Sequence, residues 1–277
     1  MNKAPAVWAG LTLDRPRIMG VLNVTPDSFS DGGDLASEGA AIAAGLSMAA
    51  DGADIVDVGG ESTRPGAAVV PPDIEQQRVI PVIQALSRQG VCVSADTRNA
   101  STMAAALDAG ATIVNDVSGL GYDPHAAALV AQRGCPVVLM HMRGTPDTMR
   151  DRAIYADVAE EVAAELRECL ARAEQAGIRR EAVVLDPGIG FAKNAEQSVA
   201  ILRALPILAA LGCPLLVGVS RKSFIGSVGR QPDARQRLPG SLAAGLFALS
   251  HGAAILRVHD VPETIQAIRV WTALTAG

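Results

Sequence analysis

Eight short apolar runs, each bounded by Gly, Pro or polar residues, are spread along the whole chain. They cover residues 17–23, 54–60, 91–97, 113–119, 136–141, 182–188, 214–220 and 253–259. Within these runs Val, Ile and Leu follow one another instead of alternating with polar residues. Continuous apolar strands are typical of a parallel sheet whose faces are covered by helices. The pattern therefore predicts eight buried parallel strands.

Ala-rich stretches of helical character separate the runs. In the clearest of them, residues 157–176, the side chains of Val158, Val162, Leu166 and Leu170 recur every fourth residue, which places them on one face of a helix. A glycine follows such a stretch before six of the runs, where it would stop the helix in the left-handed conformation. These glycines are Gly52, Gly110, Gly134, Gly177, Gly212 and Gly252.

The repeated alternation of strand and helix predicts an α/β fold, a single-domain (β/α)8 TIM barrel with its active site at the C-terminal ends of the strands. The length of 277 residues fits a barrel, which typically needs about 250. A doubly wound open sheet is the alternative, since it uses the same units. That fold normally has a Gly-rich phosphate loop after an early strand. Here the first run leads into NVTPDSFSDGG at residues 23–33, which is not such a loop, so the barrel is preferred.

Composition and charge narrow the function. Hydrophobic residues make up 49% of the chain, with two Trp, two Tyr and four Phe, so the core must be mainly aliphatic. The net charge of −5 and the dispersed cations do not provide the basic surface that nucleic acid requires. No run of about 18 apolar residues predicts a membrane span, and we expect a soluble, cytoplasmic protein. The four cysteines are far apart without a CxxC pair, so we expect free thiols.

Nearly every predicted strand ends in a polar or charged residue. For Asp57, Asp116 and His141 the simplest interpretation is a turn or helix cap, and for Glu61 that interpretation stays open. Five others are harder to explain in this way, because burying charges from different strands at one barrel mouth is costly without a ligand. These five are Asp96, Asn115, Asp186, Lys222 and Arg257.

This mixture of side chains suits a flat, nitrogen-rich ring. Ionised Asp only accepts hydrogen bonds, whereas Asn both donates and accepts, so two carboxylates and an amide match the N–H edge of an amino-pyrimidinone. Lys222 and Arg257 would then contact the ring or a phosphate-type anion. The spacing of the residues does not predict a covalent triad or a transition-metal site. A Mg²⁺ ion carried by phosphates and held by one or two protein oxygens is compatible with the sequence.

Eight motifs between residues 18 and 261 resemble those of the dihydropteroate synthase family and occur in the family's order. They are IMGVLNVTPDSFSDGG, DIVDVGGESTRPGA, SADT, NDVSG, HMRGTPDTM, DPGIGFAKN, SRKSFIG and RVHDV. The resemblance implies an N-terminal segment at residues 1–16, a pterin-binding barrel domain at 17–277, and a homodimer. It also implies synthesis of 7,8-dihydropteroate from 6-hydroxymethyl-7,8-dihydropterin pyrophosphate and para-aminobenzoate.

The resemblance implies three groups of binding residues. For the pterin ring they are Asp96, Asn115, Asp186, Lys222 and Arg257. For pyrophosphate they are Asn23, Arg64, Arg257 and His259, with Mg²⁺ held through Asn23. For para-aminobenzoate they are Phe29, Thr63, Pro65, Phe191, Lys222 and Ser223.

The implied mechanism is a dissociative substitution at the pterin methylene carbon. Pyrophosphate leaves first, and the amine of para-aminobenzoate attacks the resulting cation. The catalytic residues would be Asp31, Asp96, Lys222 and Arg257, which stabilise the charges that develop on the two sides of the breaking bond. Two rivals stay open at this point. One is a pterin-binding methyltransferase barrel, which has no use for the NVTPDSFSDGG and SRKSFIG loops. The other is a non-catalytic paralogue, which only turnover would distinguish.

Overall fold

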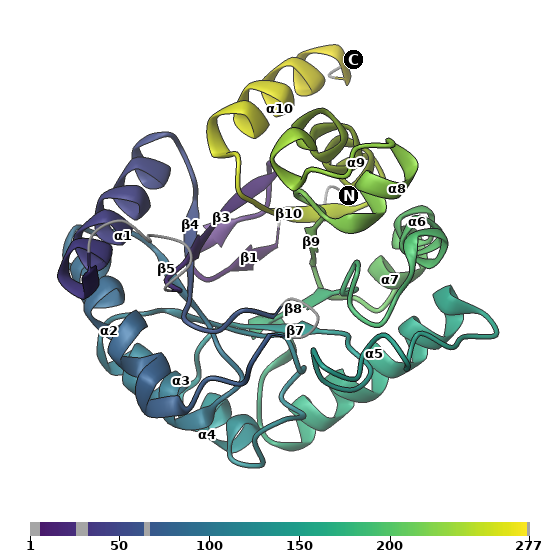
Figure 1. Cartoon of the computed structure of the whole chain (residues 1–277). Coiled ribbons are helices and arrows are strands. Elements are labelled where there is room, and N and C mark those ends of the chain that lie inside the picture. The colour runs from purple at the N-terminus through teal and green to yellow at the C-terminus, as the bar shows by residue number, and fades with distance from the viewer. Residues whose placement is uncertain (1–5, 26–32, 64–66, 276–277) are drawn as a thin grey trace.

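Eight parallel strands close into a barrel (Figure 1). The computed structural model describes residues 6–25, 33–63 and 67–275. The barrel strands are β3 (Arg17–Asn23), β4 (Ile55–Gly59), β5 (Val93–Asp96), β6 (Ile113–Asp116), β7 (Val137–Met140), β8 (Val183–Asp186), β9 (Leu215–Gly218) and β10 (Ala253–Val258). Each lies within one of the eight apolar runs. The prediction of a TIM barrel is confirmed, and the open sheet is excluded because β10 pairs with β3.

Helices form a ring outside the barrel (Figure 1). They are α1 (Gly33–Ala50), α2 (Pro72–Arg88), α3 (Ala100–Asp108), α4 (Ala126–Arg133), α5 (Val158–Gln175), α6 (Ala195–Arg203), α7 (Leu205–Ala209), α8 (Ser223–Val228), α9 (Leu238–Ser250) and α10 (Val261–Thr275), with short 3₁₀ turns at Arg180–Ala182 and Ala234–Gln236. Within the described parts of the chain, none of these helices has the length and apolar character needed to cross a membrane.

The local signals in the sequence act as expected. The helix predicted at residues 157–176 is α5, and the Asp157 carboxylate caps it by accepting hydrogen bonds from the N–H groups of Ala159 and Glu160. All six glycines expected to stop helices have positive φ, from 62° at Gly134 to 107° at Gly110. A side chain rarely adopts this conformation without strain. These glycines therefore set where the chain turns back into the next strand.

Strand residues alternate between two cores. Those facing outward, such as Val56, Leu139 and Leu185, are fully buried beneath the helices. Those facing inward fill the barrel itself. The inner cluster comprises Trp8, Met19, Ile55, Ile113, Val138, Val184, Leu216 and Ile255. This division follows from the two-residue period of a strand.

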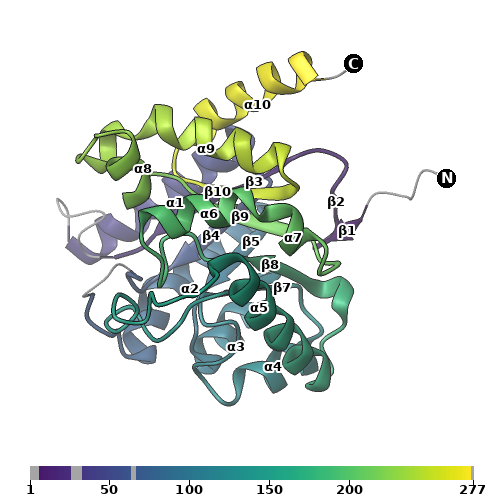
Figure 2. The same ribbon diagram turned by 90° about the vertical axis from the view of Figure 1, so that its right-hand side faces the viewer.

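A hairpin that the sequence pattern did not predict closes the N-terminal end of the barrel. It consists of β1 (Val7–Trp8) and β2 (Leu11–Thr12), which lie together at one end of the barrel in Figure 2. The Trp8 ring is 2% exposed and its Nε1–H donates to the Ala182 carbonyl at 2.9 Å. Residues 6–16 therefore contribute directly to the barrel core.

Candidate active site

A chain of charged and polar side chains crosses the C-terminal mouth of the barrel. The Arg257 guanidinium on β10 donates to Asp57 on β4 at 2.7 Å and to Asp96 on β5 at 2.6 Å. The amide of Asn115 on β6 donates to the same Asp57 oxygen at 2.9 Å. The second Asp57 oxygen is buried without a hydrogen-bond partner among the described residues. Four strands thus bring two carboxylates, an amide and a guanidinium together.

Burial at the barrel mouth shifts the pKa values of these side chains. It raises the pKa of Asp96 to about 7, although Arg257 works in the opposite direction. Burial also disfavours the charge of Arg257, but the carboxylates of Asp57 and Asp96 outweigh this effect and raise the pKa of Arg257. Arg257 therefore remains a cation, and Asp96 titrates near neutral pH. Groups with pKa values shifted in this way are common at functional sites.

A second pair, Asp186 and Lys222, faces the same mouth. Asp186 ends β8 and accepts a hydrogen bond from the Gly188 N–H at 2.7 Å. Burial raises the pKa of Asp186, and the nearby Lys222 opposes that rise. Burial lowers the pKa of Lys222 to about 8, with Asp186 again opposing. A Cβ atom at Gly218 would lie 3.9 Å from the Lys222 Nζ and 3.7 Å from the Arg257 Cβ, so this glycine sits beside both cations.

The aromatic and anion-binding candidates surround these groups. The Lys222 Nζ lies 4.6 Å from the centre of the Phe191 ring and donates to the Ile189 carbonyl. Ser223 is exposed at the first turn of α8. Asn23, at the end of β3, and Thr63, after β4, are both half-buried.

His259 follows β10 directly. It is held by Ser220, whose hydroxyl accepts from the His259 N–H at 3.2 Å and lies 3.0 Å from its Nδ1. This contact joins the end of β10 to the segment after β9. The remaining predicted site residues, Phe29, Asp31, Arg64 and Pro65, lie outside the residues that the structure describes.

Two of the cap interpretations are wrong. Asp57 lies inside β4, fully buried, and is the carboxylate shared by Arg257 and Asn115. His141 is buried in a polar cluster, where its ring nitrogens lie 2.9 Å from a Glu165 oxygen and 2.8 Å from the Lys193 Nζ. Neither residue caps a turn, because each one points to partners far away in the sequence.

The cap interpretation of Asp116 holds. Asp116 caps the turn after β6 by accepting from Ser118 and Leu120. For Glu61, whose interpretation was open, the structure shows an ion pair with the buried Arg98 at 2.9 Å instead of a helix cap. It also accepts from the Val70 N–H at 3.1 Å, so Glu61 joins both ends of the segment after β4.

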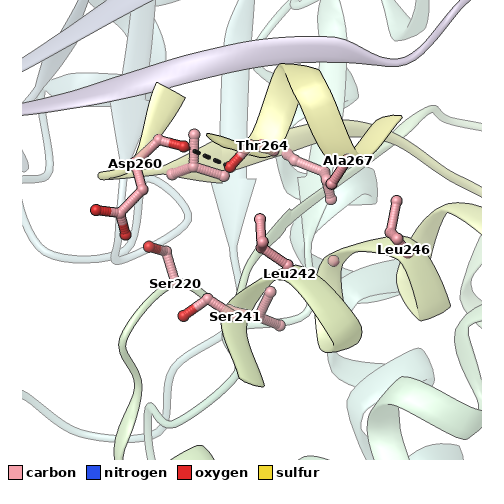
Figure 3. Close-up of a pocket in the computed structure, with 11 residues that line it drawn as sticks. Ser220, Ser241, Leu242, Leu246, Asp260, Thr264 and Ala267 are labelled. Carbon is pink, nitrogen blue, oxygen red and sulfur yellow. Dashed lines mark hydrogen bonds between the residues drawn. The ribbon is translucent and has the colours of Figure 1, made fainter. Parts of the chain in front are cut away.

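A small pocket lies beside the mouth, between α9 and α10 (Figure 3). Ser220, Ser241 and Asp260 line one end of it, and Leu242, Leu246 and Ala267 line the other. Its free volume is about 10 Å³, roughly what a single water needs. The pocket is therefore too small for a pterin, and its relevance is that Ser220 connects it to His259.

The donor set at the mouth is compatible with Mg²⁺. Among the described residues, no three His, Cys, Asp or Glu side chains come together as a metal site. Mg²⁺ needs only one or two protein oxygens when it keeps its waters and binds phosphate oxygens. The half-buried Asn23 amide offers one such oxygen at the end of β3. The residues present thus fit an ion that arrives with a diphosphate.

Comparisons with known proteins agree with this site. The profile of the pterin binding enzyme family matches residues 19–259. The dihydropteroate synthase of Synechocystis sp. is 47% identical over 275 residues, which cover 98% of this chain and 95% of that protein. A solved structure of Xanthomonas albilineans dihydropteroate synthase with 4-aminobenzoic acid is 49% identical, with a TM-score of 0.92 and 97% of each chain covered. Another from that organism, in complex with 7,8-dihydropteroate, is 46% identical, with a TM-score of 0.88 and 96% of each chain covered.

Proposed function

This chain belongs to the pterin-binding enzyme family, and its similarity to dihydropteroate synthases extends over nearly its whole length, so we propose that it catalyses their reaction. The enzyme is a transferase that condenses 6-hydroxymethyl-7,8-dihydropterin pyrophosphate with para-aminobenzoate. The products are 7,8-dihydropteroate and pyrophosphate. The observation that supports this function best is the chain of Asp96, Arg257, Asp57 and Asn115 across the barrel mouth.

We propose that the carboxylates at the barrel mouth recognise the pterin ring. Arg257 offers planar N–H donors to Asp96, and the amino-pyrimidinone edge of a pterin offers donors of the same kind. The ring would replace Arg257 on Asp96, and the flat guanidinium would then stack on the ring. Asn115 and Asp186 would bind the remaining polar atoms on that edge of the ring, and the unpaired oxygen of Asp57 would provide a further acceptor. Every buried carboxylate would then have a donor.

The cations of the site would favour departure of the diphosphate. Lys222 and Arg257 would stabilise the negative charge as the bond to the methylene carbon breaks, and His259, after β10, would donate a hydrogen bond to the diphosphate. Mg²⁺, bound through Asn23, would supply further positive charge to the leaving group. Asp96 would offset the positive charge that develops on the pterin. Asp31 and Arg64 are proposed to assist from segments outside the described residues.

We propose that para-aminobenzoate binds beside Phe191. The Phe191 ring and the Lys222 ammonium lie 4.6 Å apart, so an aromatic ring can pack on one and its carboxylate can face the other. Ser223, at the first turn of α8, would donate to that carboxylate. Thr63 would complete the pocket, with Phe29 and Pro65 from outside the described residues.

Turnover tests this proposal directly. The purified protein is incubated with dihydropterin pyrophosphate, with and without para-aminobenzoate and Mg²⁺, and pyrophosphate release is followed by a coupled assay. Mass spectrometry then identifies the product. We expect dihydropteroate only when both substrates are present. A folded protein that binds pterin but forms no dihydropteroate would point instead to a non-catalytic paralogue or to a methyltransferase barrel.

We also propose a homodimer formed through the outer face of α9 and α10. These helices contact each other and expose large apolar side chains, with Phe247 at 38%, Val270 at 57% and Leu274 at 81%. Leu274→Glu should give a monomer in analytical ultracentrifugation where the wild type sediments as a dimer. The free thiols of all four cysteines agree with the proposed cytoplasmic location, where thiols stay reduced.

A further inference from the structure

Lys193 is a buried lysine that lies behind the proposed para-aminobenzoate pocket. The residue is only 7% exposed. Its Nζ lies 2.8 Å from the His141 Nδ1, 3.0 Å from the Phe191 carbonyl oxygen and 3.2 Å from the Gly188 carbonyl oxygen. Burial lowers the pKa of Lys193 to about 7. In its ammonium form the group has three donors, and these three acceptors use all of them. The contacts of Lys193 are thus directed at one short loop and one histidine.

His141 is held in the form that can accept from Lys193. Its Nε2 lies 2.9 Å from a Glu165 oxygen. The hydrogen bond from His141, together with Arg143, lowers the pKa of Glu165 to about 2, so Glu165 is an ionised acceptor. The proton of the neutral imidazole therefore resides on Nε2, which leaves the Nδ1 lone pair facing Lys193. Arg143 also pairs with Glu161 at 2.7 Å, which ties the cluster to α5.

The loop that Lys193 holds has an unfavourable backbone. Gly188, Gly190 and Ala192 all have positive φ, at 65°, 79° and 46°. For Ala192 this conformation is strained, so other contacts must hold it in place. A Cβ atom at Gly188 would lie 1.9 Å from the His141 carbonyl oxygen, which shows how closely the loop packs on the end of β7.

Two lysines hold this loop through its backbone carbonyls. Lys193 binds the carbonyls of Gly188 and Phe191, and Lys222 binds the carbonyl of Ile189 between them. The loop therefore fixes both the Phe191 ring and the Lys222 ammonium. Without Lys193, the Phe191 carbonyl and the His141 Nδ1 would lose this donor, and the Gly188 carbonyl would keep only the Phe191 N–H at 3.0 Å. Loss of a donor to groups of this kind usually makes a local structure rearrange.

We propose that Lys193, kept in place by His141 and Glu165, is a positioning residue for the aromatic amine substrate. It acts through Phe191 and Lys222 and does not touch the substrate itself. This inference rests on the proposed function, because it assigns Phe191 and Lys222 to the para-aminobenzoate pocket. It predicts that loss of Lys193 weakens recognition of the aromatic amine more than recognition of the pterin. Of the proposed pterin partners, Asp57, Asp96 and Asn115 lie on β4, β5 and β6, and only Asp186 adjoins the loop, through the Gly188 N–H.

The first test is Lys193→Met, which keeps the apolar stem and removes the ammonium. We expect the KM for para-aminobenzoate to rise about tenfold or more, in line with the effect of misplacing a binding group. The Kd for dihydropterin pyrophosphate, measured by calorimetry without para-aminobenzoate, should change less than about threefold. A purely structural role would lower the melting temperature and the active fraction and leave both constants unchanged in the folded enzyme. A lower melting temperature with unchanged KM and Kd would overturn the proposal.

A matched pair at position 141 tests the same contact without changing the lysine. His141→Asn retains an amide oxygen near the Nδ1 position, whereas His141→Leu has no acceptor. The Asn variant should keep the KM for para-aminobenzoate within about threefold of wild type, and the Leu variant should behave like Lys193→Met. Equal KM values in the two His141 variants would contradict the proposal. This test holds even if Lys193→Met fails to fold. A wild-type protein without turnover would instead refute the proposed function, so the two failures are distinguishable.

Discussion

The N-terminal end of the barrel and its C-terminal mouth are built by the same strands but hold opposite kinds of side chain. At the N-terminal end, the Trp8 ring and aliphatic side chains from seven strands form a sealed apolar cluster. At the mouth, Arg257 lies between the carboxylates of Asp57 and Asp96. The apolar end stabilises the fold by burying hydrophobic side chains. The mouth buries charges, which cost free energy and are not needed for folding.

The apolar layer and the charged layer lie only two residues apart along each strand. Because inward-facing residues recur every second position, moving two residues along a strand leads from the apolar layer to the charged layer. The pairs are Ile55 and Asp57 on β4, Ile113 and Asn115 on β6, Val184 and Asp186 on β8, and Ile255 and Arg257 on β10. Stability and chemistry are thus divided between adjacent layers of one barrel, so substitutions in each layer should have different consequences.

The largest expected effect is at the mouth. Lys222→Ala should lower kcat/KM about 10²- to 10³-fold, the usual loss on removing one group that stabilises transition-state charge. The circular dichroism spectrum should stay close to wild type and the urea midpoint should fall only slightly, because the Lys222 ammonium contacts the Ile189 carbonyl and the Phe191 ring at the mouth. Arg133→Ala is the matched control, since it removes a cation from the half-exposed pair with Asp108 and should leave turnover unchanged. Near-normal turnover of Lys222→Ala would refute the charge assignment.

Trp8→Ala should show the converse at the other end. Removing a buried Trp costs about 3–5 kcal/mol of the free energy of unfolding, and urea titration measures this loss. The turnover number per folded molecule should not change, because the mouth lies in another layer. Trp271→Ala is the control, since this half-buried Trp on α10 packs at the edge of the outer core and should cost less. A loss of turnover in folded Trp8→Ala would show that the two ends are coupled.

The pH dependence of kcat/KM for dihydropterin pyrophosphate should report the charged groups of the mouth. The pKa of Asp96 is raised to about 7, so its carboxylate is lost as the pH falls below that value. The pKa of Lys222 is lowered to about 8, so its charge is lost as the pH rises above that value. We expect a bell-shaped profile that falls about tenfold per pH unit on each side. Asp96→Asn should remove the acidic limb, and a profile unchanged by this substitution would contradict the assignment.

Much of the barrel was predictable because its signals are local. Consecutive Val, Ile and Leu mark each strand, and a glycine stops six of the helices before the strand that follows. The hairpin of β1 and β2 was not predictable in this way. Its two strands have two residues each, and Trp8 is held by the carbonyl of Ala182, 174 positions away.

The site was predicted in part for the same reason. Asp96, Asn115, Asp186 and Arg257 stand at strand ends, where a barrel places its active site. The sequence favours a cap at Asp57 because an Asp at the end of a strand is usually one, and its partner Arg257 is 200 positions away. The two-residue spacing from Ile55 was the signal that Asp57 faces inward. Lys193 gave no such signal, because its role depends on contacts that only the folded loop creates.

The smallest expected effect lies at the boundary between the two layers. Ser94 on β5 is fully buried, two residues before Asp96, and its hydroxyl has no hydrogen-bond partner among the described residues. An unpaired buried hydroxyl costs roughly 1–3 kcal/mol. Ser94→Ala should therefore raise the free energy of unfolding by about 1 kcal/mol and leave kcat/KM unchanged. Urea titration and steady-state kinetics on the same preparation measure both quantities.

The stability and turnover of Ser94→Ala also show where the charged layer ends. If stability rises and turnover is unchanged, Ser94 belongs to the apolar layer, and the chemistry begins only two residues further along the strand. If turnover falls while the protein stays folded, the hydroxyl is a ligand contact, and the pterin reaches deeper into the barrel than Asp96. The second result would contradict the division between the layers, because a residue level with the apolar layer would then contribute to catalysis.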